Sequence, residues 1–217
     1  GVMKSIISAT ALAFVSLSIA GCPNPTANKP RAEVEAPVKE APAPPADEAD
    51  PSDVYVVSGL ASRIDFVGAK VTGKHDGGFK TFEGRISVPD SKVEEASIEI
   101  EIDMDSLWTD AEKLTGHLKS VDFFESEKFP EAKFVSTSIV KSEVEGATHS
   151  ITGNLSLRGV EKSITFPASI EVSDAGVKAS SEFALDRKLF GITYPGMPVD
   201  LIKDDVLVKL TIDAKAK

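Results

Sequence analysis

The residues best suited to chemistry gather between Leu114 and Ser136, in the stretch LTGHLKSVDFFESEKFPEAKFVS. This stretch contains a histidine, several acids and lysines, and paired phenylalanines. Such groups could form an acid–base site or a metal site, or they could cover a ligand that the protein holds without transforming. Which of the three applies depends on the residues that could act with them and on the elements that position them.

The histidines show no spacing typical of a catalytic or metal site. His75 lies between Lys74 and Asp76, but adjacent residues of a strand or turn point in different directions, so Asp76 is poorly placed to orient its neighbour. A metal site would need His75 and His117 to meet with a third ligand, and no spacing brings them together. We therefore expect no metal and no catalytic residue, and we assign His117 and Ser120 to hydrogen bonds with the backbone.

Signatures of nucleophilic catalysis and phosphate binding are also missing from the sequence. There is no G-x-S-x-G motif, and the glycines of TGNLSLRG precede a strand rather than the helix that a phosphate loop requires. The formal net charge of −10 opposes nucleic-acid binding, which needs clustered Lys and Arg. The sequence therefore predicts a binding protein that is not an enzyme, with no cofactor and no nucleic-acid partner.

The first residues indicate the compartment. Lys4 precedes the short apolar run IISATALAFVSLSIA, which ends in Gly21 and Cys22, and this pattern predicts a signal peptide over residues 1–21. The run is shorter than the roughly 20 apolar residues that a transmembrane anchor needs. IAGC resembles a bacterial lipobox, which implies cleavage before Cys22 and its acylation with chains such as palmitate. Cys22 is the only cysteine of the chain, although an ordinary signal peptide with a chance cysteine is the alternative.

Residues 22–53 follow as a segment rich in proline, alanine and acids, without aromatic residues or apolar periodicity. Such a segment buries too little surface to offset its ordering entropy, so we predict a disordered tether that lifts a domain off the membrane. Residues 54–217 then have the size of one domain. Together these features place the protein in the cell envelope, lipid-anchored at the outer membrane facing the periplasm or at the cell surface.

The domain shows the two-residue period of strands. Ile98, Ile100, Ile102 and Met104 alternate with polar residues in SIEIEIDMD, as in a strand with one wet face. Similar alternation predicts strands at 63–67, 80–88, 151–157, 163–172, 178–185 and 206–212, and a further strand is predicted at 133–139, after the turn at Pro130. Turn residues separate them in KHDGG (74–78), PDSK (89–92), RGVEK (158–162) and SDAG (173–176).

About eight long amphipathic strands with tight links favour an all-β, antiparallel barrel, because closure removes exposed sheet edges. One crossover is predicted to be helical. Leu114, Leu118 and Val121 have helical spacing, Thr109 and Glu112 fit a capping box, and Pro130 ends the crossover.

Three further motifs carry a resemblance to a known family. They are SRIDFVGAKVTGKHDGGF at 62–79, HLKSVDFFESEKFPEAKFVS at 117–136, and GNLSLRGVEKSITFP with the looser LDRKLFGI, in which Arg187, Phe190 and Gly191 match R-x-x-F-G. Through them the chain resembles the YceI-like family of bacterial periplasmic proteins. The resemblance implies a lipocalin-like barrel around a long apolar tunnel that binds polyisoprenoid or other long-chain lipids. The lipobox and the long link ITYPGMPVDLIKDD depart from the usual family pattern.

The inward face of the strands is predicted to be entirely apolar, which suits an alkyl or prenyl chain. Periodicity alone leaves a packed core as an alternative. We predict that the ligand contacts Ile64, Phe66, Phe82, Ile86, Ile98, Ile100, Ile102, Met104, Phe134, Ile170 and Phe183. The predicted function is to bind or carry a long apolar ligand such as a polyisoprenoid. Two alternatives remain, an envelope enzyme acting on a lipid and a ligand-free structural or interaction barrel.

Overall fold

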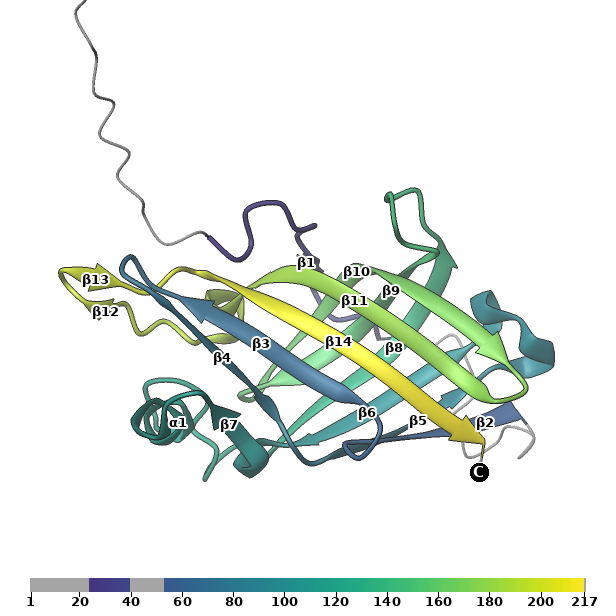
Figure 1. Ribbon diagram of the computed structural model, residues 1–217, viewed down its shortest axis with the longest axis horizontal. Coiled ribbons are helices and arrows are strands. Elements are labelled where there is room, and N and C mark those ends of the chain that lie inside the picture. The colour runs from purple at the N-terminus through teal and green to yellow at the C-terminus, as the bar shows by residue number, and fades with distance from the viewer. Residues whose placement is uncertain (1–23, 40–52, 217) are drawn as a thin grey trace, which may run out of the picture.

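The computed structural model describes residues 24–39 and 53–216, and its main feature is a β-barrel (Figure 1). The strands of the barrel and its extensions are β1 (Glu33–Glu35), β2 (Val54–Ser58), β3 (Arg63–Ala69), β4 (Lys74–Phe79), β5 (Phe82–Ser87), β6 (Ser97–Asp103), β7 (Leu107–Thr109), β8 (Glu131–Lys141), β9 (His149–Leu157), β10 (Val160–Ser173), β11 (Gly176–Asp186) and β14 (Asp205–Ala216). A helix, α1 (Glu112–Lys119), lies in the crossover, and a short hairpin joins β12 (Gly196–Met197) to β13 (Asp200–Leu201).

The ring closes in the order β10-β9-β8-β6-β5-β2-β14-β11 and back to β10, with antiparallel pairing at every step. This arrangement confirms the predicted eight-stranded antiparallel barrel with one helical crossover. The long strand β14 pairs with β2 at Lys215 and Ala216, but with β3 from Leu207 to Thr211. The sheet β3-β4-β7 therefore branches from β14 and extends the wall toward one end of the barrel, where Figure 1 also places α1 and the β12–β13 hairpin.

One predicted turn is wrong. The residues KHDGG were assigned to a turn, yet Lys74–Phe79 form β4, which pairs with β3 on one side and β7 on the other. A Cβ atom on Gly77 would lie 2.5 Å from the ring of Phe66, and one on Gly78 would lie 2.7 Å from the carbonyl oxygen of Ile64. The glycines therefore serve close packing between neighbouring strands, a role that sequence punctuation does not distinguish from a turn.

The predicted capping box is also wrong. Helix α1 begins at Glu112 after Ala111, whose side chain makes no capping hydrogen bond. The hydroxyl of Thr109 accepts a hydrogen bond from the Ala111 N–H at 3.3 Å, and the Thr109 N–H donates to the Thr115 hydroxyl at 2.9 Å. Leu118 is buried, whereas Val121 lies beyond the helix and is 64% exposed. No helix within the described ranges is long and apolar enough to cross a membrane.

The predicted tether is only partly compatible with the structure. Residues 24–39, called the N-terminal segment below, pack on the barrel, and within them β1 pairs with β10 while Ala32 is 6% exposed. The prediction of disorder is therefore wrong for this part. It counted only the side-chain surface that the segment could bury, whereas the backbone finds hydrogen-bond partners on two strands. Residues 40–52, and Cys22 with the predicted signal peptide, lie outside the described residues.

Candidate functional site

The barrel encloses a cavity of about 410 Å³, within the range of about 300–1,000 Å³ that is typical of ligand pockets. All of the residues predicted to contact a ligand line this cavity except Phe82 and Ile170. Phe82 is 5% exposed and belongs to the same buried cluster as the lining residues Ile64 and Ile86, but it does not itself border the cavity. Ile170 is half-buried on β10 and packs against the core. The alternation rule therefore identified the inward face, but it did not separate positions beside the cavity from positions in packed core.

The register between β11 and β14 shows where the cavity ends. Directly paired residues of antiparallel strands point to the same face. Val177 and Ala214 form one such pair, are 1% and 0% exposed, and lie outside the lining, whereas the next inward pair, Ala179 and Ile212, lines the cavity. Lining residues continue along β11 to Leu185, roughly 20 Å beyond Ala179 at about 3.3 Å per residue, and Arg187 follows just after the strand ends. The cavity is therefore elongated along the strands and closed near the chain's C-terminus.

The ionisable side chains of the lining are Lys70, His75 and Arg187, all of them basic. Lys70 and His75 lie at the same end of the barrel, since His75 is the strand partner of Gly68, two residues before Lys70. Lys70 forms an ion pair with Asp200 at 2.5 Å. His75 Nδ1 lies 2.7 Å from Asp110 Oδ1, so its acidic partner is not the adjacent Asp76 but a residue of the crossover.

These ion pairs lower the pKa values of their carboxyl groups. Burial raises the pKa of Asp110, but hydrogen bonds from His75 and from the Asp76 N–H outweigh it, and the pKa lies below the ordinary 3.8. The pKa of Asp200 is also lowered, chiefly by the hydrogen bond from Lys70 and further by hydrogen bonds from Thr72. Both carboxylates are therefore charged at neutral pH, and each faces one of the bases at the rim of the cavity.

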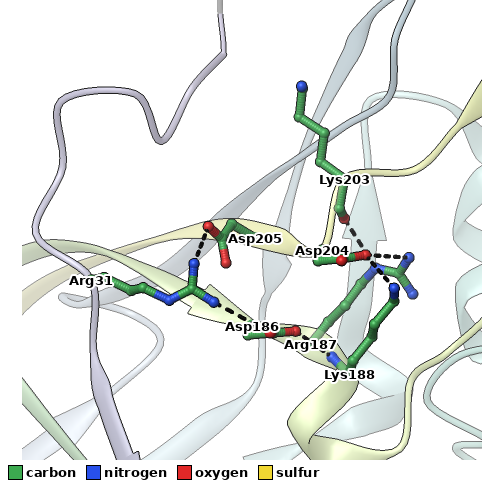
Figure 2. A network of polar contacts seen from close by, with 7 residues as sticks. All are labelled: Arg31, Asp186, Arg187, Lys188, Lys203, Asp204 and Asp205. Carbon is green, nitrogen blue, oxygen red and sulfur yellow. Dashed lines mark hydrogen bonds and ion pairs between the residues drawn. The ribbon is translucent and has the colours of Figure 1, made fainter.

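Arg187 is the most deeply placed of the three bases, with only 6% of its side chain exposed. Its Nε donates to the carbonyl of Lys203 at 3.1 Å, and its Nη1 donates to the carbonyl of Ile192 at 2.6 Å. Among the residues that the structure describes, its Nη2 has no hydrogen-bond partner; it lies 3.8 Å from Asp204 Oδ1, a contact drawn in Figure 2. Burial lowers the pKa of Arg187. This guanidinium fixes two loop segments at the end of the cavity where the chain leaves β11.

The comparison with known proteins places this barrel in a family. A sequence profile of the YceI-like domain matches residues 55–214. The chain belongs to the YceI-like family. A UPF0312 protein of Pseudomonas putida strain W619 is 37% identical over 141 residues, covering 61% of this chain and 71% of that relative. A UPF0312 protein of Shewanella denitrificans is 36% identical over 142 residues, covering 61% of this chain and 72% of that relative.

Solved structures show the same YceI-like fold. BcnA of Burkholderia cenocepacia superposes with a TM-score of 0.62 at 21% identity, covering 72% of this chain and 98% of BcnA. A polyisoprenoid binding domain from Saccharophagus degradans gives a TM-score of 0.60 at 16% identity, covering 76% of this chain and 99% of that domain. At these identities the solved structures establish a shared fold.

In this YceI-like barrel, the stretch 114–136 covers one end of the cavity. Leu114, Leu118, Phe123 and Phe124 all line it. His117 lies outside the lining, and its Nε2 is 2.8 Å from Asp122 Oδ2.

The polar groups of this stretch have structural partners. The Ser120 hydroxyl donates to the His117 carbonyl at 2.7 Å, in agreement with the predicted backbone contact of Ser120. His117 itself contacts a carboxylate and the rings of Phe123 and Tyr194, with ring centroids 5.0 and 5.1 Å away. No cluster of three or more metal-ligating side chains occurs among residues 24–39 and 53–216. The stretch therefore contributes apolar side chains to the cavity and polar side chains to its own fold.

The sequence analysis missed the basic residues that line the cavity. Lys70 and His75 belong to the motif at 62–79, and Arg187 belongs to R-x-x-F-G. The sequence indicated only their motif positions and a possible catalytic role, not a place in the cavity wall. A strand assignment for residues 74–79 would have placed His75 opposite Gly68 and so beside Lys70. Asp110 is 35 residues from His75 in the chain, and no local sequence pattern predicts that contact.

Proposed function

We propose that this YceI-like protein binds a long apolar ligand, such as a polyisoprenoid chain, in the barrel cavity. The observation that carries the proposal is the elongated cavity, whose wall is apolar from Ala179 and Ile212 almost to its basic end. Each methylene transferred from water into such a cavity contributes about 0.8 kcal/mol, so a long chain gains affinity with every carbon it buries. The description of the related Saccharophagus degradans domain as polyisoprenoid binding supports this ligand class.

The proposed ligand has a preferred orientation. Its apolar tail occupies the closed end beside Ala179, and any polar head lies near Lys70 and His75. Both bases already face carboxylates, so a polar head finds hydrogen-bond donors there without meeting an unpaired charge. A packed barrel without a ligand would leave no such cavity, and the cavity therefore favours the binding function over a structural one.

We also propose that acylation of Cys22 anchors the protein in the cell envelope, at the outer membrane facing the periplasm or at the cell surface. The structure supports a short connection between the anchor and the barrel. Only Pro23 separates Cys22 from Asn24 in the sequence, and the N-terminal segment begins at Asn24. The barrel then rests beside the bilayer, and the predicted long tether does not separate them.

A second candidate, an enzyme acting on a bound lipid, is favoured by one contact. His75 and Asp110 form a histidine–carboxylate pair at 2.7 Å on the rim of the cavity, a geometry that a general base can use. His75→Ala separates the two functions. Lipid binding without chemistry predicts that the variant and the wild type leave a bound lipid equally unchanged over hours, whereas loss of a product formed by the wild type identifies an enzyme.

Lipids that co-purify with the full chain from bacterial envelopes test the main proposal. Native mass spectrometry should show one long-chain apolar molecule per protein, and Ile100→Trp, which narrows the cavity, should abolish its retention. A wild-type protein that carries no lipid and binds no fluorescent prenyl probe would contradict the binding function.

A further inference from the structure

The wall of the barrel is not continuous between β10 and β11. The two strands pair directly only from Ser169 to Ser173 of β10 and from Gly176 to Ser180 of β11. Beyond this part, the Ser181 hydroxyl donates to the Pro167 carbonyl at 2.5 Å, and no further backbone pair joins these two described strands. β11 continues to Asp186 beside β14, so β10 and β11 separate over the half of the barrel that leads to Arg187.

Part of the N-terminal segment fills this separation. Residues 30–35, called the bridging segment here, contact both strands, and Figure 1 shows β1 next to β10. On one side, the Ala184 N–H donates to the Pro30 carbonyl at 2.8 Å and the Ala32 N–H donates to the Ala184 carbonyl at 2.9 Å. On the other side, Glu33–Glu35 pair with β10. The bridge to β11 is parallel in a barrel that is otherwise antiparallel, as expected for an inserted strand.

The inner side of the bridging segment faces the residues of the cavity wall. Ala32 belongs to the same buried cluster as Ile164, Phe183 and Leu185, and these three line the cavity. Val34, half-buried, packs against that cluster. With the bridging segment in place, the wall is complete. Without it, the side chains of the wall would face solvent or a bilayer between two separated strands.

The bridging segment is held by weak contacts. Its ladder with β10 has only the pairs of β1, whereas the β11–β14 ladder runs from Val177 to Asp186. Its buried side chain is a small one, that of Ala32. The remaining links are the two backbone hydrogen bonds with Ala184 and ion pairs on the outside. Arg31, with a side chain 55% exposed, lies 2.6 Å from Asp205 and 3.3 Å from Asp186 (Figure 2). Exposed ion pairs of this kind contribute little and are screened by salt.

We propose that the bridging segment is a displaceable part of the barrel wall, and that its release opens a lateral passage between β10 and β11 for a long apolar chain. This inference rests on the proposed lipid-binding function. A lateral passage lets a chain slide in sideways along its length, as a lipid leaving a bilayer would need to do. The bridging segment lies close to Cys22 in the sequence. The proposed anchor would therefore hold the passage at the membrane surface.

A disulfide that fixes the bridging segment to β10 tests the proposal. Glu33 and Thr165 are direct strand partners, and such pairs have Cα separations of about 4.5–5.5 Å, which a disulfide can span. The full chain with Cys22→Ser, Glu33→Cys and Thr165→Cys has no other cysteine. When oxidised, it should take up and release a fluorescent prenyl probe at least tenfold more slowly than when reduced. A matched lock, Glu171→Cys with Lys178→Cys, joins β10 to β11 where they already pair, and it should leave both rates unchanged.

Equal probe kinetics in the oxidised and reduced Glu33–Thr165 lock would overturn the lateral passage and leave the end near Lys70 as the route. A wild type that binds no probe would instead count against the proposed function. Hydrogen exchange tests, without any ligand, whether the bridging segment detaches from the folded barrel. The amide protons of Ala32 and Ala184 form the hydrogen bonds between the bridging segment and β11. They should exchange at least tenfold faster than the amide protons that donate between β11 and β14, and faster again in high salt. Exchange at the same rate as the ladder would show that the segment opens only on global unfolding, and the proposal would fall.

Discussion

The ring of Phe134 packs against Gly153, so closely that a Cβ atom at position 153 would be 2.4 Å from the ring. Phe134 lines the cavity from β8, and Gly153 belongs to the neighbouring strand β9. The same close contact recurs between Phe66 and Gly77. Each glycine gives a large side chain room along the wall, so that the side chain does not fill the cavity.

Gly153→Ala should therefore push Phe134 toward the cavity and destabilise the fold. The added methyl would also meet the Val135 carbonyl at 2.6 Å, and overpacking of this kind costs about 1–3 kcal/mol. Chemical denaturation measures the change. Phe134→Leu should recover part of the loss in the double variant, because the two residues share one contact. Strictly additive effects would show that the ring and the glycine do not constrain one another.

Acid titration should reveal the ion pairs at the rim of the cavity. The pKa values of Asp110 and Asp200 lie below 3.8 in the folded protein, so their contribution to stability is present above that pH and is lost as the pH falls through the lowered values. Carbon NMR of the two carboxyl groups should give midpoints below 3.8. His75→Ala should raise the pKa of Asp110 alone, and Lys70→Met that of Asp200 alone. A midpoint for Asp110 at or above 3.8 in the wild type would contradict the His75 contact.

The barrel itself could be predicted because its signal is local and repeated. Ile98, Ile100 and Ile102 alternate with polar residues in one strand. Every strand of the barrel has one face toward the interior and one toward solvent, so the same alternation recurs in each of them. Residues 63–67 and 206–212 showed it as well, and they lie in β3 and β14 of the structure. The same signal failed for Phe82, because a residue in packed core and a residue beside a cavity are equally apolar.

What the sequence could not show depends on partners far along the chain. Asp110 meets His75 only because β7 pairs with β4. Ala32 is buried only because β10 and β11 separate and leave a place for it. The composition of the segment around Ala32 predicted disorder, because its side chains are mostly small or charged. The segment is ordered because it forms hydrogen bonds with the backbone of Ala184 and of β10, and composition gives no information about such partners.

Deleting residues 24–39 should lower the thermal midpoint, contrary to what a disordered tether predicts. The loss of the pairs with β10 and of the burial of Ala32 should cost about 1–3 kcal/mol, or about 2–4 °C for each kcal/mol in a domain of this size. Differential scanning calorimetry gives the shift. Ala32→Asp should destabilise by no more than the deletion, because the segment can detach to keep the new charge in water. The exposed neighbour Glu33→Asp should leave the midpoint unchanged, and an unchanged midpoint after the deletion would show that the segment does not stabilise the barrel.

The binding function depends most on whether Ile100 faces open space. Ile100 lines the cavity between its strand partners Gly84 and Phe134, and it is 8% exposed. In a packed core, Ile100→Trp would cost about 1–3 kcal/mol or more through overpacking, and Ile100→Ala would cost about 2–5 kcal/mol. Beside a cavity, the added ring has room, and truncation abandons fewer neighbours.

We therefore expect delipidated Ile100→Trp to unfold within about 1 kcal/mol of the wild type, yet to lose retention of a fluorescent prenyl probe, because the indole occupies the space of the chain. Glu101→Trp is the matched control, since Glu101 is the next residue of β6 and pairs with Lys133 on the outer face at 2.9 Å. It should keep the probe. Strong destabilisation by Ile100→Trp, in a protein whose wild type never binds the probe, would mean that the barrel is filled, and the lipid-binding function would have to be abandoned.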